Sequence, residues 1–151
     1  DFAHHVYDDP QANLAMTDYY RFHAEQMAYL IATLESTPDG QGQSLMDNTL
    51  IVWGGEMADG WHGYEKYFMM LAGGAWAFDT GRYMHYPWQS TPVDLMLPFG
   101  NFTRSGVPHH HVLVSVARAL GLDIDQVGLH QIESKLGERV SLRGGLEGLL
   151  V

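Results

Sequence analysis

Residues 47–63 read DNTLIVWGGEMADGWHG, a stretch in which an apolar run leads directly into ionisable residues. Turn-forming residues precede Leu50–Trp53, a short apolar run rich in branched side chains, which is typical of a buried strand. Two glycines come next, and after them the ionisable residues Glu56, Asp59 and His62. This order predicts a strand that leaves the interior of a sheet and delivers ionisable side chains at its end.

The end of this strand is a candidate binding site. Ligands in α/β proteins bind where the loops at strand ends converge on a crevice, and Gly54 and Gly55 allow a sharp turn and a close approach of another group. A carboxylate at Glu56 and an imidazole at His62 can reach one metal ion across the intervening loop. The alternative is a surface loop in which the acid is solvated and His62 packs beside Trp61.

Histidine is over-represented, with nine histidines against eight lysines and arginines together. His4 and His5 lie on an irregular N-terminal stretch beside Asp8 and Asp9. Because adjacent side chains there cannot easily face the same way, at most one of the two histidines is expected to be a metal ligand. The alternative is an N-terminal loop with ordinary surface histidines.

Two other groups of polar residues carry weaker predictions. Residues 109–111 are three consecutive histidines at the predicted start of a helix, where successive side chains point about 100° apart and therefore do not converge on one ion. This geometry argues against a metal site at these residues. Arg82 either clamps a phosphate or sulfate or, as we favour, pairs with one of the many acids.

Composition excludes several classes of function. The net charge of −10 argues against a nucleic acid or an anionic membrane as the partner. The sequence has no cysteine, which removes disulfides, thiolate catalysis and cysteine zinc sites. No apolar run approaches the ~20 residues of a membrane helix, so we expect no membrane insertion. The chain begins at Asp1, from which we expect a processed protein or a piece of a longer one.

The periodicity of the chain predicts its main elements. Apolar residues at three- and four-residue steps predict a helix over Asn13–Glu35. Tyr67–Ala72 reads as a second buried strand, Arg82–His85 as a short strand, and the residues after Pro108 as a second helix. The segment after residue 122 is weakly patterned. A helix followed by apolar strands points to an α/β layer arrangement.

The order of these segments resembles a known group of proteins. The segments that carry the resemblance are YYRFHAEQMAYLIATLEST, MDNTLIVWGGEMADGWHG, YFMMLAGGA with TGRYMHY, PHHHVLVSVARALGL and GGLEGLL. Together they resemble the C-terminal part of an uncharacterised family of exported bacterial proteins with twin-arginine signals. That family is similar to the alkaline phosphatase and sulfatase superfamily, and the resemblance covers roughly residues 2–151.

The resemblance implies a fold, a location and a partner. It implies a partial alkaline-phosphatase-like three-layer α/β fold, with helices packed on a mostly parallel sheet. Residues 1–151 would then be a single domain, the C-terminal portion of a larger protein that is periplasmic or extracellular in a bacterium. Because a partial sheet exposes unpaired edges, we expect tight association with the remainder of the precursor or with another protein chain.

The resemblance also implies a composite metal site. In the superfamily the matching strand ends in an Asp-His pair that binds a catalytic metal, and a later histidine binds a second metal. Glu56 stands at the position of that aspartate, Met57 at that of the histidine, and His62 is the later histidine. A thioether is a poor ligand for zinc, calcium or manganese. The site that remains consists of Glu56, His62 and either His4 or His5.

These patterns support two functions. The first is a non-catalytic or vestigial module of an exported protein, which Met57 and the lack of a segment matching the superfamily's nucleophile region favour. The alternative is a metal-dependent hydrolase of phosphate or sulfate esters, whose nucleophile lies on the N-terminal part that these residues do not include. The excess of histidine and the acid at the strand end favour this alternative.

Overall fold

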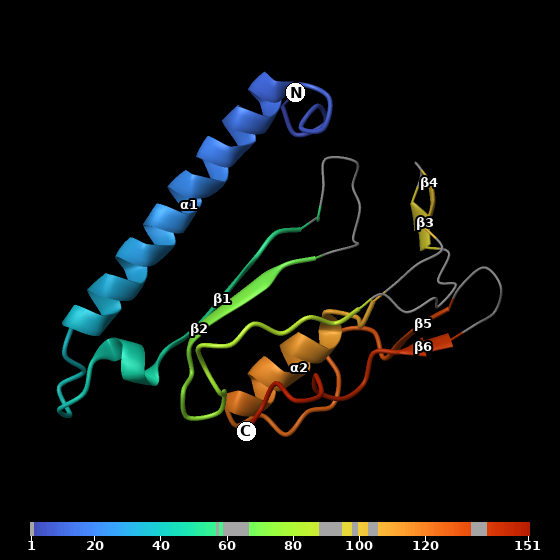
Figure 1. Cartoon of the computed structure of the whole chain (residues 1–151). Coiled ribbons are helices and arrows are strands. Elements are labelled where there is room, and N and C mark those ends of the chain that lie inside the picture. The colour runs from blue at the N-terminus through green and yellow to red at the C-terminus, as the bar shows by residue number, and fades with distance from the viewer. Residues whose placement is uncertain are drawn as a thin grey trace. The chain divides into compact units, whose positions relative to one another are not determined.

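Two compact units make up the chain, residues 1–74 and residues 75–151 (Figure 1). The computed structural model describes residues 2–56, 58, 67–87, 95–97, 100–102, 106–133 and 139–151. The single domain expected from the sequence stays a prediction.

A long helix, α1 (Pro10–Ser36), opens the first unit. Its start is fixed by Asp9, whose carboxylate accepts a hydrogen bond from the Gln11 amide at 2.8 Å. Pro10 suits the first helical position because it has no amide to leave unpaired. The predicted helix over Asn13–Glu35 is therefore confirmed, with a start three residues earlier. Of its 27 residues only Ala12 is buried.

A short 3₁₀ helix, η1 (Leu45–Asn48), connects α1 to the first strand. It begins with a capping box, in which the Asp47 amide donates to the Ser44 hydroxyl and the Asp47 carboxylate accepts from the Ser44 amide at 2.8 Å. The hydrogen bond from the Ser44 amide, followed by that from its hydroxyl, lowers the pKa of Asp47. The capping box fixes the direction in which the chain enters the strand.

Strands β1 (Leu50–Gly54) and β2 (Met69–Gly73) form an antiparallel pair, from Leu50 opposite Gly73 to Gly54 opposite Met69. Both strands were predicted from the sequence, and both exist, but the expectation that they are buried is wrong: their residues are half-buried, and Val52 and Gly54 are exposed. Gly73 adopts a φ of +81°, and a Cβ there would lie 2.1 Å from the Thr49 carbonyl oxygen, so only glycine fits at this end of the pair.

The parallel sheet expected from the resemblance is wrong. The other described strands pair as β3 (Leu95–Leu97) with β4 (Gly100–Phe102) and β5 (Gln131–Glu133) with β6 (Arg139–Ser141), both antiparallel. The described strands thus form three two-stranded antiparallel sheets rather than one layer of a three-layer fold. A parallel pair needs a crossover, usually a helix, and residues 55–68 carry no helical pattern. The coarser α/β prediction, mixed helices and strands, is confirmed.

The second unit holds most of the buried apolar side chains of the described residues. Helix α2 (His110–Ala119) buries Val114 completely, and Phe78, Leu142 and Leu149 are also buried. Residues 78 and 150 form a β-bridge, so the two ends of this unit lie side by side. The weakly patterned segment after residue 122 therefore contributes to the core. The short strand predicted over residues 82–85 is irregular chain instead.

Candidate functional site

The strand end singled out by the sequence lies where it was predicted. Glu56 follows β1 and is exposed to solvent. One residue earlier, the Gly55 carbonyl accepts a hydrogen bond from the Tyr67 hydroxyl, which joins the two chain segments at the open end of the β1–β2 pair. Met57, Asp59 and His62 lie outside the described residues, so the predicted pairing of Glu56 with His62 stays a prediction.

The N-terminal turn places the other two predicted ligands close to the start of α1. His4 is half-buried, whereas His5 is exposed and its Nδ1 lies 3.4 Å from a carboxylate oxygen of Asp8. The neighbouring acid, Asp9, is occupied as the cap of α1. A shallow hollow of about 480 Å³ is lined by Val6, Tyr7, Asp8, Asp9, Pro10, Asn13 and Leu14.

A metal centre is not assembled within the part of the chain that the structure describes. There, no three histidine, cysteine, aspartate or glutamate side chains are grouped so that they could hold an ion. Since His62 lies outside that part, the composite site of Glu56, His62 and His4 or His5 is neither formed nor excluded by this geometry.

The three histidines at the start of α2 make contacts of different kinds. The rings of His109 and His110 lie 4.6 Å apart, centre to centre. The Nδ1 of His111 lies 2.9 Å from the Gly144 carbonyl oxygen, to which it donates when it carries the proton. Burial lowers the pKa of His110, and the neighbouring His109 and His111 lower it further. His109 stands at the N-cap position, and its side chain makes no capping hydrogen bond.

A buried serine links this helix to a later segment, and sequence reasoning missed it. Ser115 is completely buried; its hydroxyl donates to the His111 carbonyl at 3.0 Å and accepts from the Leu146 amide at 2.8 Å. A Cβ at Gly145 would lie only 2.8 Å from that hydroxyl oxygen. The signals in the sequence were a serine within an apolar helical stretch and the Gly144-Gly145 pair, which together indicate a close approach of two backbones.

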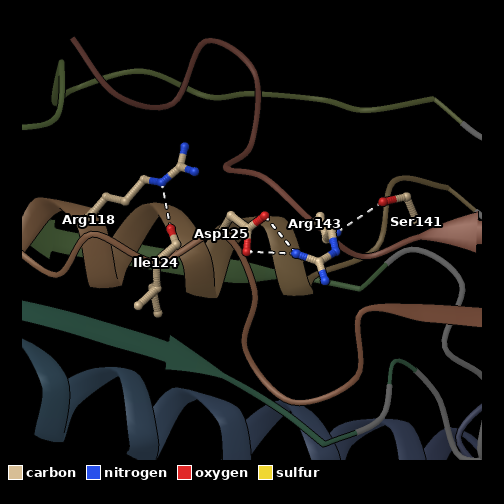
Figure 2. Close-up of polar contacts among 5 residues, drawn as sticks. All are labelled: Arg118, Ile124, Asp125, Ser141 and Arg143. Carbon is tan, nitrogen blue, oxygen red and sulfur yellow. Dashed lines mark hydrogen bonds and ion pairs between the residues drawn. The ribbon is translucent and has the colours of Figure 1, made fainter.

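Three arginines of this unit donate hydrogen bonds to backbone carbonyls or to a carboxylate of a neighbouring loop. Figure 2 shows Arg143 donating to both carboxylate oxygens of Asp125, at 3.1 and 2.9 Å, while Arg118 Nε donates to the Ile124 carbonyl at 2.9 Å. Arg82 donates to the Leu149 carbonyl at 2.9 Å. Arg82 therefore contacts the backbone, and the anion clamp and the acid partner considered from the sequence both stay predictions.

Comparison with known proteins identified no relative of this chain. No family model, no curated protein and no solved structure matches the chain.

Proposed function

We propose that this chain is a non-catalytic module of an exported bacterial protein, related to the alkaline phosphatase and sulfatase superfamily, which works only within a larger assembly. The observation that carries the proposal is the small amount of apolar surface buried in the first unit. Over the described residues of 1–74, Ala12 is the only hydrophobic residue that is fully buried.

The long helix shows this lack of a core most directly. On the apolar face predicted from the sequence, Met16 and Met27 are half-buried, whereas Leu30 is exposed. Phe22 and Tyr29 lie elsewhere on the helix and are 55% and 72% exposed. A helix with apolar side chains on more than one side is typical of a position inside a larger protein, so α1 is expected to be covered on both sides.

The small sheets support the same proposal. An isolated two-stranded pair is marginally stable at best in water, and three or more strands or a covering helix are needed for independent stability. Among the described residues no further strand pairs with the outer edges of β1 and β2, so their backbone groups are available for pairing. Further strands from elsewhere would satisfy both needs.

We propose that the exposed apolar side chains of α1 are covered by the upstream part of the same precursor. An incomplete sheet and an uncovered helix within one compact unit are what remains when neighbouring elements of the same fold are taken away, and the sequence resemblance points to such elements before residue 1. Export to the periplasm or beyond is proposed on that resemblance. None of the helices in the described part of the chain is both long and apolar enough to cross a membrane.

Polar substitution of Phe22 and Tyr29, two exposed apolar side chains of α1, tests this proposal. Alone, residues 1–151 are expected to self-associate in sedimentation velocity and to enhance the fluorescence of the dye ANS, which binds exposed apolar surface. The double variant Phe22→Ser/Tyr29→Ser should reduce both signals. Tyr83→Ser, at a tyrosine of the second unit that is 84% exposed, serves as the matched control and should leave them unchanged.

A second measurement identifies the occupant. When co-expressed with the upstream part of its precursor, the chain should co-purify with that part, and the double variant should not. Co-purification with the product of another gene instead would replace the precursor as the occupant. A monodisperse monomer of 16.9 kDa that ignores the dye would overturn the module proposal.

The hydrolase alternative has its own test, which is metal content after purification without a histidine tag. If Glu56, His62 and His4 or His5 form a site, the protein should carry zinc, calcium or manganese at about one ion per chain, as a three-ligand centre does. Glu56→Ala should remove the ion, whereas Glu25→Ala, at an exposed acid on α1, should not. A protein without bound metal would leave the module proposal as the simpler one.

A further inference from the structure

Three aromatic side chains lie exposed along one side of α1. Tyr19, Phe22 and Tyr29 are each more than half exposed, and we call them the aromatic stripe. Because successive residues of a helix lie about 100° apart, the three side chains fall within about 80° of its circumference. Apolar residues scattered singly over a surface are ordinary, whereas a group on one side of an element marks an interaction site.

The aromatic stripe lies on a different side of α1 from the half-buried residues. Met16 and Met27 are half-buried and lie roughly 100° further round the helix. Between the two sides stands His23, whose ring centre is 4.4 Å from that of Tyr19 and 5.5 Å from that of Phe22. These edge-to-face contacts restrict the rings, so less conformational freedom is lost when a partner binds to them.

Negative charge is concentrated in the unit that carries the stripe. By sequence, the first unit contains eleven aspartates and glutamates against two lysines and arginines, so it carries −9 of the net charge of −10. A partner that approaches α1 therefore meets a strongly negative field, which attracts positive charge and repels negative charge.

One carboxylate borders the stripe and has no ion-pair partner among the described residues. Glu25 is exposed and lies three residues from Phe22 and four from Tyr29, the spacing at which helical side chains are neighbours. The other acid on this side, Asp18, is paired with Arg21 at 2.6 Å. The stripe therefore has one negative charge at its edge that no described residue neutralises.

Exposed aromatic rings beside an acid fit a partner that is both basic and apolar. Arginine and lysine side chains bind over aromatic faces through their charge, and their aliphatic stems cover apolar surface at the same time. Opposite charges also steer the association and exclude partners of the wrong sign. A second copy of the first unit would bring its own excess of negative charge, which makes it a poorer fit than a basic segment.

We propose that the aromatic stripe and Glu25 bind a basic amphipathic segment, in which arginine or lysine side chains stand beside apolar ones. Its apolar side chains lie on the three rings, and one of its cations pairs with the Glu25 carboxylate. As to where that segment comes from, the inference rests on the proposed function, which places it in the upstream part of the precursor.

Two synthetic peptides test this chemistry on residues 1–151. Both are amphipathic helices of about 18 residues, or five turns, with the same leucine face; one has arginine on its polar face and the other glutamate. Fluorescence anisotropy measures their binding below the concentration at which the chain self-associates. The arginine peptide should bind more than about tenfold more tightly, because like charges repel across an interface. Raising sodium chloride from about 0.05 to about 0.5 M should weaken its binding, since salt screens exposed charges.

Variants of α1 locate the surface that binds the arginine peptide. Glu25→Lys should weaken binding by about fivefold, the upper range for one exposed ion pair, and Phe22→Ser/Tyr29→Ser should weaken it further. Glu35→Lys is the matched control, because it makes the same charge change at an exposed acid of the same helix, about 120° round from Tyr29. It should weaken binding by less than about twofold, since it alters the field but not the contact.

Equal binding of the two peptides, or binding of neither, would overturn the basic partner. Equal losses in Glu25→Lys and Glu35→Lys would overturn its place on α1. The peptide comparison and the salt dependence use the unaltered protein, so they decide even if a variant fails to fold. All these failures leave the module proposal standing if the chain binds the dye and co-purifies with the upstream part. Conversely, a monomer that ignores the dye but binds the arginine peptide through Glu25 would overturn the module and retain the basic partner.

Discussion

Gly145 illustrates how a single missing side chain allows two segments to meet. The Ser115 hydroxyl lies so close that a Cβ at this glycine would be 2.8 Å away from it, and the serine is completely buried and cannot move aside freely. Alanine at this position therefore forces the 142–151 segment away from α2 or shifts the helix.

Replacing Gly145 by alanine should lower the free energy of unfolding by about 1–3 kcal/mol, the usual cost of overpacking. Chemical denaturation of the purified protein measures it. Gly106→Ala is the matched control, because within the described residues the nearest atom to a Cβ there would be the Tyr86 carbonyl oxygen at an ordinary 3.9 Å. The combination with Ser115→Ala should cost less than the sum of the two single changes, since the clash is then relieved. Equal costs for Gly145→Ala and Gly106→Ala would contradict this account.

The sequence predicted the position of a polar residue only where the residues that determine it are its neighbours in the chain. Glu56 could be placed at a strand end because the branched run and the glycines precede it directly in the sequence. Ser115 and Arg82 could not be assigned, because their partners lie 31 and 67 residues further along the chain. Nothing in the residues around either one identifies so distant a partner.

At the scale of elements, the two main helices differ in what stabilises them. Helix α1 has 27 residues and buries one, whereas α2 has ten and buries Val114 and Ser115. Most helical stability in proteins comes from packing of an apolar face rather than from intrinsic propensity. The shorter helix is therefore expected to be the more persistent of the two.

Amide hydrogen exchange at neutral pH should show this order. Amides near Phe22 are expected to exchange faster than those near Val114, because local opening of α1 exposes little that is buried. Addition of the upstream part of the precursor should slow exchange in α1 and leave α2 unchanged. Equal protection of the two helices in the isolated chain would mean that α1 is already covered.

The sequence predicted where the main helices and strands lie, but not how the strands pair. The helical period placed α1 and α2, and the apolar runs placed β1 and β2. The expected parallel pairing is wrong for β1 and β2, which are antiparallel. A continuous apolar run was interpreted as a strand of a parallel sheet, but the run itself does not determine the direction of its partner. Pairing depends on the connection between strands, and the sequence of that connection shows turn-forming residues and no helical pattern.

At the scale of the whole molecule, the composition predicted more burial than the structure has. An apolar share of 46% suggested an ordinary core, yet many large apolar side chains of the described residues are exposed, on both units. Composition fixes how much apolar surface exists but not whether this stretch of chain can cover it alone. Because much of the apolar surface is not buried within this chain, we expect a larger assembly that covers it.

The bonds that close the second unit have a consequence for how the protein is made. The Val151 amide donates to the Ala77 carbonyl at 3.0 Å, and Phe78 pairs with Leu150, so the beginning of this unit is completed by chain synthesised about 70 residues later. Contacts so far apart in sequence form slowly, because the entropy cost of closing the loop comes before the contacts can stabilise it. Until Leu150 has left the ribosome, Phe78 lacks its bridge partner, and we expect the nascent unit to be exposed to chaperones and proteases for that time.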